Sequence, residues 1–328
     1  MSKDQLNMEV EIDDGGDLRG HLSALSIAGR SEEISYTALA YAFESLEREP
    51  AAPITLSICL PFCPTIDLTC DRVAVAGHEQ NVIEAYLNGI YKEIALVAAK
   101  LGDTPRLLSR VHIHGASPNY LSEIALAHLF TAINDCFDVW DGTKVSFELD
   151  PRRASRSQLN FLRGLGVRDL HLQVRDLDPI VQGEIGRVQS LELLKDVIDI
   201  SREAGFESIG IDQVYGLPGQ SIASFEKSID SLISLSPDWV ECNVFVKREK
   251  VFPNQNALNE RQIPSLADKL AMYEALNHRV QFSGYQPVGL SLFCQANHAL
   301  ATAQVNGCLS LNILGFSPQP QSWVIGVG

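Results

Sequence analysis

The stretch ITLSICLPFCPTIDLTC, residues 54–70, begins with an apolar, β-branched run and continues into a loop that carries Cys63, Asp67 and Cys70. The run Ile54 to Cys59 has the composition of a buried strand. Parallel β/α barrels carry their functional groups in the loops that follow their strands. The stretch therefore predicts a first barrel strand followed at once by a functional loop.

Apolar β-branched runs alternate with longer amphipathic segments from residue 54 onward. This rhythm predicts right-handed βαβ units and a parallel sheet, and hence an α/β fold of the β/α-barrel type. Six strands are expected near Ile54–Cys59, Arg110–His114, Lys144–Leu149, Asp169–Val174, Ser208–Val214 and Trp239–Val246. Helices are expected at about 82–101, 121–135, 156–164, 190–205, 222–235 and 265–282.

The domain organisation is expected to be simple. Residues 1–50 are acidic and irregular, with a helix-like stretch near Tyr36 to Leu46, and we interpret them as an N-terminal extension. Residues 51–328 contain only short Pro/Gly clusters typical of turns, and no linker that would separate two domains. They are expected to form one barrel domain.

Composition argues against two classes of partner. The 328 residues carry a formal charge of -15, which would repel a nucleic-acid backbone. No run approaches the roughly 20 apolar residues that a membrane helix needs, and the N-terminus lacks the apolar region of a signal peptide. Seven cysteines, an odd number, fit a reducing compartment. We expect a cytoplasmic protein that acts on a small molecule and contacts neither nucleic acid nor membrane.

Ionisable groups gather at the carboxyl ends of five consecutive expected strands. The segments concerned are Leu60–Cys70, His112–Pro118, Glu148–Pro151, Gln173–Asp176 and Asp212–Pro218. Any one of them could cap a strand or a turn. Five together predict a functional site at this end of the barrel.

Four segments carry a resemblance to a known family. Leu-Pro-Phe-Cys63, His114-Gly-Ala-Ser117-Pro, Ser-Phe-Glu148-Leu-Asp-Pro and Gly-Ile-Asp212-Gln-Val-Tyr-Gly-Leu-Pro-Gly-Gln stand in the order found in oxygen-independent coproporphyrinogen III oxidases. The chain resembles this branch of the radical S-adenosylmethionine (radical SAM) superfamily from about Tyr36 to Gly328. The resemblance implies a partial (β/α)6 parallel barrel of the radical-SAM type.

The cysteine motif departs from the family pattern. The family's Cys-x3-Cys-x2-Cys holds a 4Fe-4S cluster, and its matching positions here are Cys63, Asp67 and Cys70. These three would be the metal ligands if a cluster were retained, with Cys59 as an alternative third thiolate. Since soft thiolates suit iron-sulfur clusters better than a carboxylate does, we do not expect an ordinary cluster.

The resemblance also implies a SAM pocket. Its residues would be Ser117, Glu148, Arg175, Arg187 and Asp212. Glu148 resembles the ribose-binding carboxylate, which can accept hydrogen bonds from both hydroxyl groups. Arg175 stands where the family has glutamine. The stretch from His114 to Pro118 replaces a glycine-rich one whose bare backbone approaches the methionine end of the ligand. We expect the nucleoside side of the pocket to be better kept than the methionine side.

The chain stops at Gly328, where the family continues into a mostly helical domain that covers the substrate. Radical intermediates need exclusion of water and oxygen, so oxidation of coproporphyrinogen is not expected of this chain.

Three functions remain open. The first is a SAM-dependent transferase or lyase that uses the sulfonium in polar alkyl transfer or intramolecular displacement, with Asp67, His112, His114 or His171 as the catalytic base. The second is a radical SAM enzyme with an atypical cluster held by cysteine and aspartate. The third is a non-catalytic relative that binds a tetrapyrrole, or a metal such as zinc.

Overall fold

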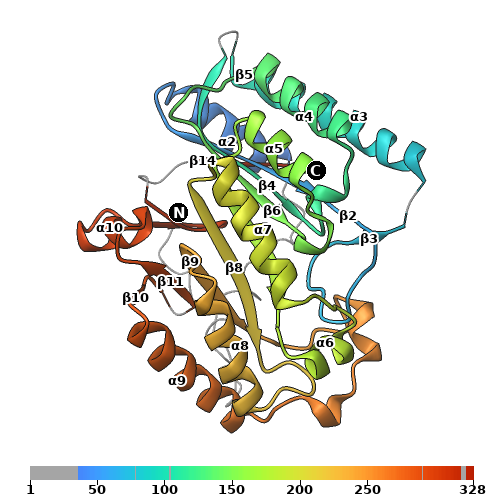
Figure 1. Ribbon diagram of the computed structural model, residues 1–328. Helices are drawn as coiled ribbons and strands as arrows, with labels where there is room; N and C mark the ends of the chain where they lie inside the picture. Colours follow the sequence, from blue (N-terminus) through green and yellow to red (C-terminus); the bar gives the residue numbers. More distant parts are fainter. Residues whose placement is uncertain (1–35, 78, 103–104, 290, 319–322) are drawn as a thin grey trace, which may run out of the picture.

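The computed structural model describes residues 36–77, 79–102, 105–289, 291–318 and 323–328 (Figure 1). Residues 1–35 of the expected N-terminal extension lie outside this range, and helix α2 spans Tyr36–Glu47. Six parallel strands form the body of the main sheet: β1 Ile54–Leu60, β4 Arg106–Gly115, β6 Lys144–Leu149, β7 Asp169–Arg175, β8 Ser208–Tyr215 and β9 Trp239–Val244. They lie side by side in chain order. The expected parallel α/β sheet is confirmed.

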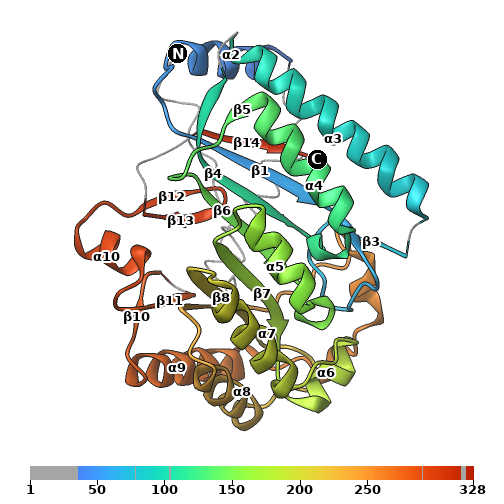
Figure 2. The same cartoon turned by 45° about the horizontal axis from the view of Figure 1, so that its top comes forward.

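Six long helices cover one face of the curved sheet (Figure 2). They are α3 Gln80–Lys100, α4 Glu123–Cys136, α5 Arg156–Gly164, α7 Leu191–Ala204, α8 Ile222–Ser234 and α9 Leu266–Phe282. All but α3 begin after a serine whose hydroxyl accepts a backbone N–H of the first turn, which satisfies one of the free donors there. No helix in the described part of the chain has both the length and the apolarity needed to cross a membrane.

Strand alternation separates an apolar face from a polar face. The residues that face the helices are buried and apolar, among them Leu56, Val111, Phe147, Leu172, Ile211 and Val240. The alternate residues face the interior of the curve and are largely polar, among them Ser57, His112, Ser146, Glu148, His171 and Asp212. The hydrophobic core therefore lies between sheet and helices, and the concave face is left for chemistry.

The shorter elements complete the fold. They are β2 Phe62–Cys63, β3 Val75–Ala76, β5 Phe137–Asp138, α6 Pro179–Ile185 and the 3₁₀ turns η2 Pro118–Tyr120, η3 Pro151–Arg153, η4 Pro253–Ala257 and η5 Glu260–Gln262. The sequence did not predict them, because two to seven residues are too few to display a period. The six predicted strands and helices are confirmed, although β4 begins at Arg106, four residues before the predicted start, and β9 ends at Val244, two residues before the predicted end.

The C-terminal segment joins the two edges of the sheet. β10 Tyr285–Pro287 and β11 Leu292–Gln295 follow α9, and β11 pairs antiparallel with β9. Helix α10 Ala299–Val305 and the hairpin of β12 Ser310–Asn312 with β13 Gly315–Ser317 come next. β14 Trp323–Val327 then pairs parallel with β1 at the opposite edge. The segment thus covers both edges and crosses the open side of the barrel.

Gly115 provides a test of how tightly the carboxyl ends of β1 and β4 approach. It has a φ of 131°, and a Cβ there would lie 2.2 Å from the carbonyl oxygen of Leu60. We expect Gly115→Ala to lower the free energy of unfolding by about 3 kcal/mol or more, because backbone cannot yield as a side chain does. Urea denaturation of the purified variants measures this.

Gly89→Ala is the matched control, since Gly89 lies in α3 with no atom within 4 Å of an added Cβ. It should stabilise the protein by about 0.5–1 kcal/mol through helix propensity. Equal unfolding midpoints for the two variants would contradict the close approach of β1 and β4.

Candidate functional site

Glu148 lies at the centre of the polar face because of the strand register. On the neighbouring strand β7 its register partner is His171, and on β4 the register places His114 beside it. His112 is one step closer to the amino end of β4. The Oε1 atom of Glu148 lies 4.0 Å from Nε2 of His112 and 3.8 Å from Nδ1 of His171. Three histidines and one carboxylate predicted from the sequence are therefore brought together.

Arg72 makes the closest contact to this carboxylate. Its Nη1 atom donates to Oε2 of Glu148 and, at 2.9 Å, to the carbonyl oxygen of Gly115. Gln173 donates to the same carboxylate oxygen at 3.0 Å. Burial by itself would raise the pKa of Glu148, but the attraction of Arg72 and of the imidazoles holds that pKa well below its usual range. Glu148 is consequently an ionised, buried acceptor.

Serine hydroxyl groups contact two of the three histidines, His112 and His114. Nδ1 of His112 is 2.8 Å from Oγ of Ser146, and Nε2 of His114 is 2.8 Å from Oγ of Ser57. The two rings stack with centroids 5.0 Å apart. Burial, followed by the charge of Arg110, lowers the pKa of His112 well below its usual range. His112 is therefore a neutral imidazole at pH 7, and it has a free lone pair that can take a proton.

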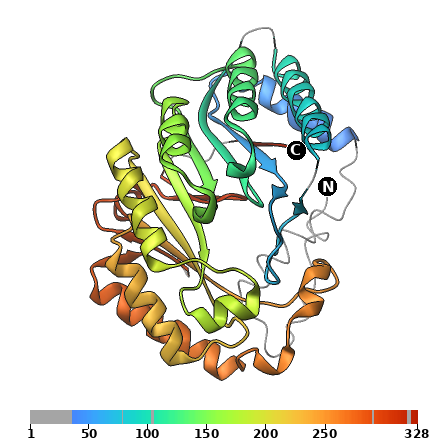
Figure 3. The same ribbon diagram turned by 45° about the vertical axis from the view of Figure 1, so that its right-hand side comes forward.

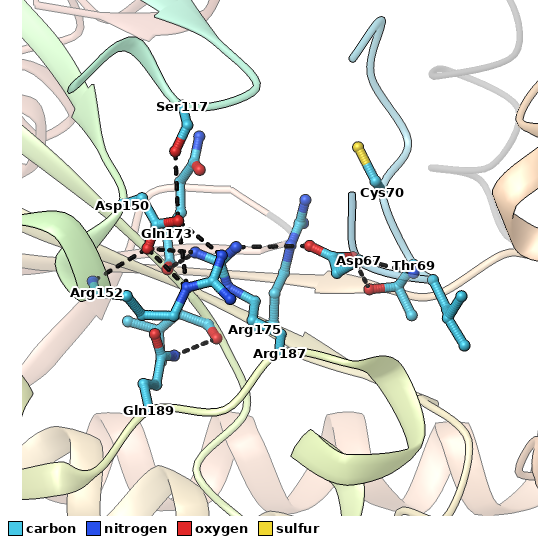
Figure 4. A network of polar contacts seen from close by, with 12 residues as sticks. Asp67, Thr69, Cys70, Ser117, Asp150, Arg152, Gln173, Arg175, Arg187 and Gln189 are labelled. Atoms are coloured by element: carbon cyan, nitrogen blue, oxygen red, sulfur yellow. Dashed lines mark hydrogen bonds and ion pairs between the residues drawn. The ribbon is translucent and has the colours of Figure 1, made fainter. Parts of the chain in front are cut away.

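Asp67 lies apart from the histidines. Its Oδ1 atom accepts from the backbone N–H of Thr69 at 3.0 Å and from the Thr69 hydroxyl at 2.8 Å, and its Oδ2 atom is 3.5 Å from Nη1 of Arg187. Figure 4 shows these contacts running from Asp67 to Thr69 on one side and to the arginine cluster on the other. The carboxylate is already engaged from both sides.

The cysteine loop is clamped by distant parts of the chain. The side-chain amide of Asn254 donates to the carbonyl oxygens of Asp67 and Cys70, at 3.2 and 3.0 Å, and Gln255 donates to Cys70 as well. The N–H of Leu68 donates to Ile185 at the end of α6. Figure 3 shows the loop between β1 and α3 descending beside α6 and the segment after β9. These contacts fix the conformation of the loop.

In this conformation the three side chains of the cysteine motif contact other groups of the chain. The thiols of Cys63 and Cys70 lie 3.8 Å from the carbonyl oxygens of Val75 and Arg72, and Asp67 is bound to Arg187 and Thr69. Burial, with the charge of Cys70, raises the pKa of the Cys63 thiol to about 11. In the part of the chain that the structure describes, no three His, Cys, Asp or Glu side chains are grouped to hold a metal ion.

Arg175 has an unusual backbone conformation. Its φ is 74°, rare for a residue other than glycine, and the pairing of β7 with β8 shifts register there. Oδ1 of Asp212 accepts the N–H groups of Val174 and Arg175 and so fixes the bend. The Arg175 guanidinium then lies 3.8 Å from Asp212 and 3.4 Å from Asp71. Such strain costs on the order of 1–3 kcal/mol, which these contacts offset.

Arg187 and Asp150 complete the strand-end cluster. Nη2 of Arg187 donates to the carbonyl oxygen of Gln173 at 2.6 Å and lies 3.3 Å from Asp150. Asp150 is also bound by Arg152 at 2.7 Å and accepts from the Ser117 hydroxyl at 3.3 Å (Figure 4). The space left between these side chains and the cysteine loop is a cavity of about 20 Å³. That volume holds about one water molecule.

The structure brings the five residues of the expected SAM pocket to one end of the barrel, but each charged one already has a partner in this chain. Sequence reasoning missed those partners, chiefly Arg72, Asp71 and Gln173. The only sequence signal for Arg72 was its place directly after the last cysteine of the loop.

His112 makes the stability of the protein depend on pH. The unfolded chain takes up this proton near pH 6.5, whereas the folded protein does so only at a much lower pH. Stability is therefore lost as the pH falls below about 6.5, at up to about 1.4 kcal/mol per pH unit for this one group. We expect His112→Asn to reduce the slope of unfolding free energy against pH between about 5 and 6.5, as urea titrations would measure. The same change at the exposed His128 should leave the slope intact; identical slopes in all three proteins would refute the assignment.

Comparisons with known proteins show which sequences and folds this chain resembles. The model of the radical SAM superfamily matches residues 76–232. Oxygen-independent coproporphyrinogen III oxidase of Synechocystis is 30% identical over 276 residues, which cover 84% of this chain and 59% of that protein. The Escherichia coli enzyme is 28% identical over 285 residues, covering 87% and 62%. The chain thus spans about three fifths of the length of these curated relatives.

The solved structure of coproporphyrinogen III oxidase from Escherichia coli, described as a radical SAM enzyme, superposes with a TM-score of 0.86 at 28% identity. The superposition covers 91% of this chain and 68% of that one. Sequence and fold together show that this chain carries a match to the radical SAM superfamily model and is similar to the oxygen-independent coproporphyrinogen III oxidases.

Proposed function

We propose that this chain is a SAM-binding enzyme that works without an ordinary 4Fe-4S cluster and uses the sulfonium in polar alkyl transfer or intramolecular displacement. The proposal rests on one contrast. The acids and the arginine of the expected nucleoside pocket converge at the strand ends, whereas the cysteine loop has a carboxylate engaged by Arg187 where the family has its middle thiolate. The substrate would be a small molecule, and the protein would act in the cytoplasm.

The polar groups at the strand ends suit a nucleoside, but the cavity between them is too small to hold one. Glu148 and Asp212 are acceptors for hydroxyl groups, and Arg187 is a donor fixed at the same end of the barrel. Ligand pockets usually measure about 300–1,000 Å³, far more than the 20 Å³ cavity found here. Binding would therefore require the Arg175 side chain to leave Asp212 and Asp71. We infer that SAM binding and Arg175 displacement are coupled.

The histidine cluster supplies a base. A bound sulfonium offers an electron-poor carbon, so the protein needs only to orient a nucleophile and accept its proton. His112 is neutral, so its imidazole can accept that proton, and its Nε2 atom lies 4.0 Å from the ionised Glu148. The carboxylate would stabilise the imidazolium that results. His171 has the same relation to Glu148, at 3.8 Å. Asp67 is a poorer candidate, because Arg187 and Thr69 occupy its oxygens.

Calorimetric titration with SAM tests both binding and its coupling to Arg175. We expect the wild type to bind, and Arg175→Gln to bind about tenfold more tightly, since glutamine no longer pairs with Asp212 and the competing interaction of about 1.4 kcal/mol is gone. Asp212→Asn should weaken binding, because one hydroxyl acceptor is lost.

Arg156→Gln is the matched control, as Arg156 makes an exposed ion pair with Glu203 and, within the residues that the structure describes, contacts none of the expected pocket residues. Its affinity for SAM should equal that of the wild type. The absence of binding in both the wild type and Arg175→Gln would reject the proposal, and equal affinities of the two would reject the coupling.

Anaerobic reconstitution with iron and sulfide tests the cluster. We expect well under one iron atom per chain, against about four for an intact cluster of this type. Iron near four atoms per chain, lost in Cys63→Ser but kept in Cys136→Ser, would favour the radical alternative. Formation of 5'-deoxyadenosine under reductant would then decide for it.

A further inference from the structure

A second, larger cavity lies along the concave face of the sheet, toward the amino ends of the strands. We call it the lumen chamber; its volume is about 610 Å³. Its walls include Arg110 and His112 of β4, Asp169 and His171 of β7, and Trp239 and Asn243 of β9. Glu148 and Arg72 form its boundary with the strand-end cluster. A volume of this size suits a small organic ligand.

The C-terminal segment supplies the remaining wall. Residues 297–300 at the start of α10 and the β12–β13 hairpin line the chamber with Leu300, Leu314 and Phe316. Figure 2 shows this hairpin on the side of the sheet opposite the helices. Since the segment also pairs with β9 and β1, the wall is tied to both edges of the barrel. The chamber thus has the sheet as one wall and the C-terminal segment as another.

Two aromatic rings give part of the chamber a flat, apolar lining. The indole of Trp239 lies over Gly210, where a Cβ would come within 1.9 Å of the ring, and its centroid is 4.7 Å from that of His171. Its Nε1 atom donates to Ser208, which fixes the plane of the ring. Phe316 lies over Gly289 in the same way, with 2.4 Å to an added Cβ. Such surfaces favour a planar apolar body.

The polar groups left unmet in the chamber are acceptors. Within the described residues, Oδ1 of Asn243 and Nε2 of His171 are buried with no hydrogen-bond partner. Nδ1 of His171 faces the ionised Glu148 at 3.8 Å, which places the ring proton on Nδ1 and leaves a lone pair on Nε2. The carboxylate of Asp169 makes no hydrogen bond or ion pair closer than 4 Å with any described residue, and burial raises its pKa. These groups call for a ligand that donates hydrogen bonds.

The charge of the lining points the same way. The lining holds five carboxylates, but Glu148 pairs with Arg72, Glu207 with Lys144 and Arg168, and Asp238 with Arg202. Across the described ranges Asp169 has no such ion pair, and the cation that acts on it most strongly is Arg110. Arg72 is bound to Glu148 and Lys144 to Glu207, so those cations cannot also serve an anionic ligand. A ligand cation beside Asp169 would therefore be stabilised by its carboxylate.

We propose that the lumen chamber is a binding site for a small organic cation with a flat aromatic body, such as an aromatic primary amine. Its ring would lie against Trp239 and Phe316, and its ammonium group would donate to Asp169 and His171. The chamber is separate from the strand-end cavity expected to hold SAM, although its walls include the histidines proposed above as the base.

Three indole probes that differ mainly in charge test the site: the cation tryptamine, its neutral alcohol analogue tryptophol, and the anion indole-3-propionate. Calorimetric titration at pH 7.5 should show tryptamine binding at least about tenfold more tightly than tryptophol, with no detectable binding of the anion. No binding of tryptamine, or equal affinity for tryptamine and tryptophol, overturns the proposal. This comparison uses the unaltered protein and so does not depend on the folding of any variant.

Asp169→Asn locates the site. We expect it to reduce the affinity for tryptamine about tenfold and to leave that for tryptophol unchanged, because only the charge-assisted contact is lost. Asp199→Asn, on the exposed side of α7, is the control and should match the wild type. Unchanged tryptamine affinity in Asp169→Asn would place the probe elsewhere. Displacement of tryptamine by SAM would contradict two separate sites.

Discussion

The arrangement of the site depends on the ion pair between Arg72 and Glu148. A carboxylate buried to this degree would be protonated or would destabilise the fold unless a cation accompanied it. The cation comes from the cysteine loop, 76 residues away in the chain, and the same guanidinium binds the carbonyl oxygen of Gly115 where β4 approaches β1. One contact therefore keeps Glu148 ionised, joins the loop to the barrel end, and separates the strand-end cluster from the lumen chamber.

The same compensation recurs at three other acids near the strand ends. Asp212 is paired with Arg175, Asp67 with Arg187, and Asp150 with Arg152. A site built to receive a charged ligand commonly leaves some charge for that ligand to neutralise, whereas here the chain supplies the opposite charges itself. Arg175 reaches its acids only by adopting a positive φ, so the sequence retains strain at the place where the family has glutamine. This combination favours a pocket that opens by exchange of partners over one that stands preformed.

The sheet could be predicted from the sequence because the pattern that identifies each strand and helix lies within a few consecutive residues. Strands that are apolar on one face, such as Lys144–Leu149, and helices that bury Leu126, Leu129 and Ile133 display their periods within a few residues. Residues at strand ends, such as Glu148 and Asp212, could be assigned to one end of the barrel for the same reason. Their partners could not be predicted. The pairing of Arg175 with Asp71 spans 104 positions, and β14 joins β1 across most of the chain, so neither contact leaves a local pattern.

These long-range contacts explain why the barrel interior has one small cavity at the strand ends and one larger cavity toward the amino ends of the strands. Charged side chains that pair with one another at the strand ends fill the region where the resemblance implies a nucleoside, leaving about 20 Å³. Toward the amino ends of the strands, Ser146, His171 and Asn243 line a cavity of about 610 Å³. Glycine at position 210 leaves room for the indole of Trp239 to lie against the sheet. A polar interior that is not closed by its own side chains must be solvated or filled by a ligand, since unmet acceptors in a buried space are costly. The part of the barrel near the amino ends of the strands therefore holds the larger cavity. Its acceptors Asp169, His171 and Asn243 determine which kind of ligand can bind there.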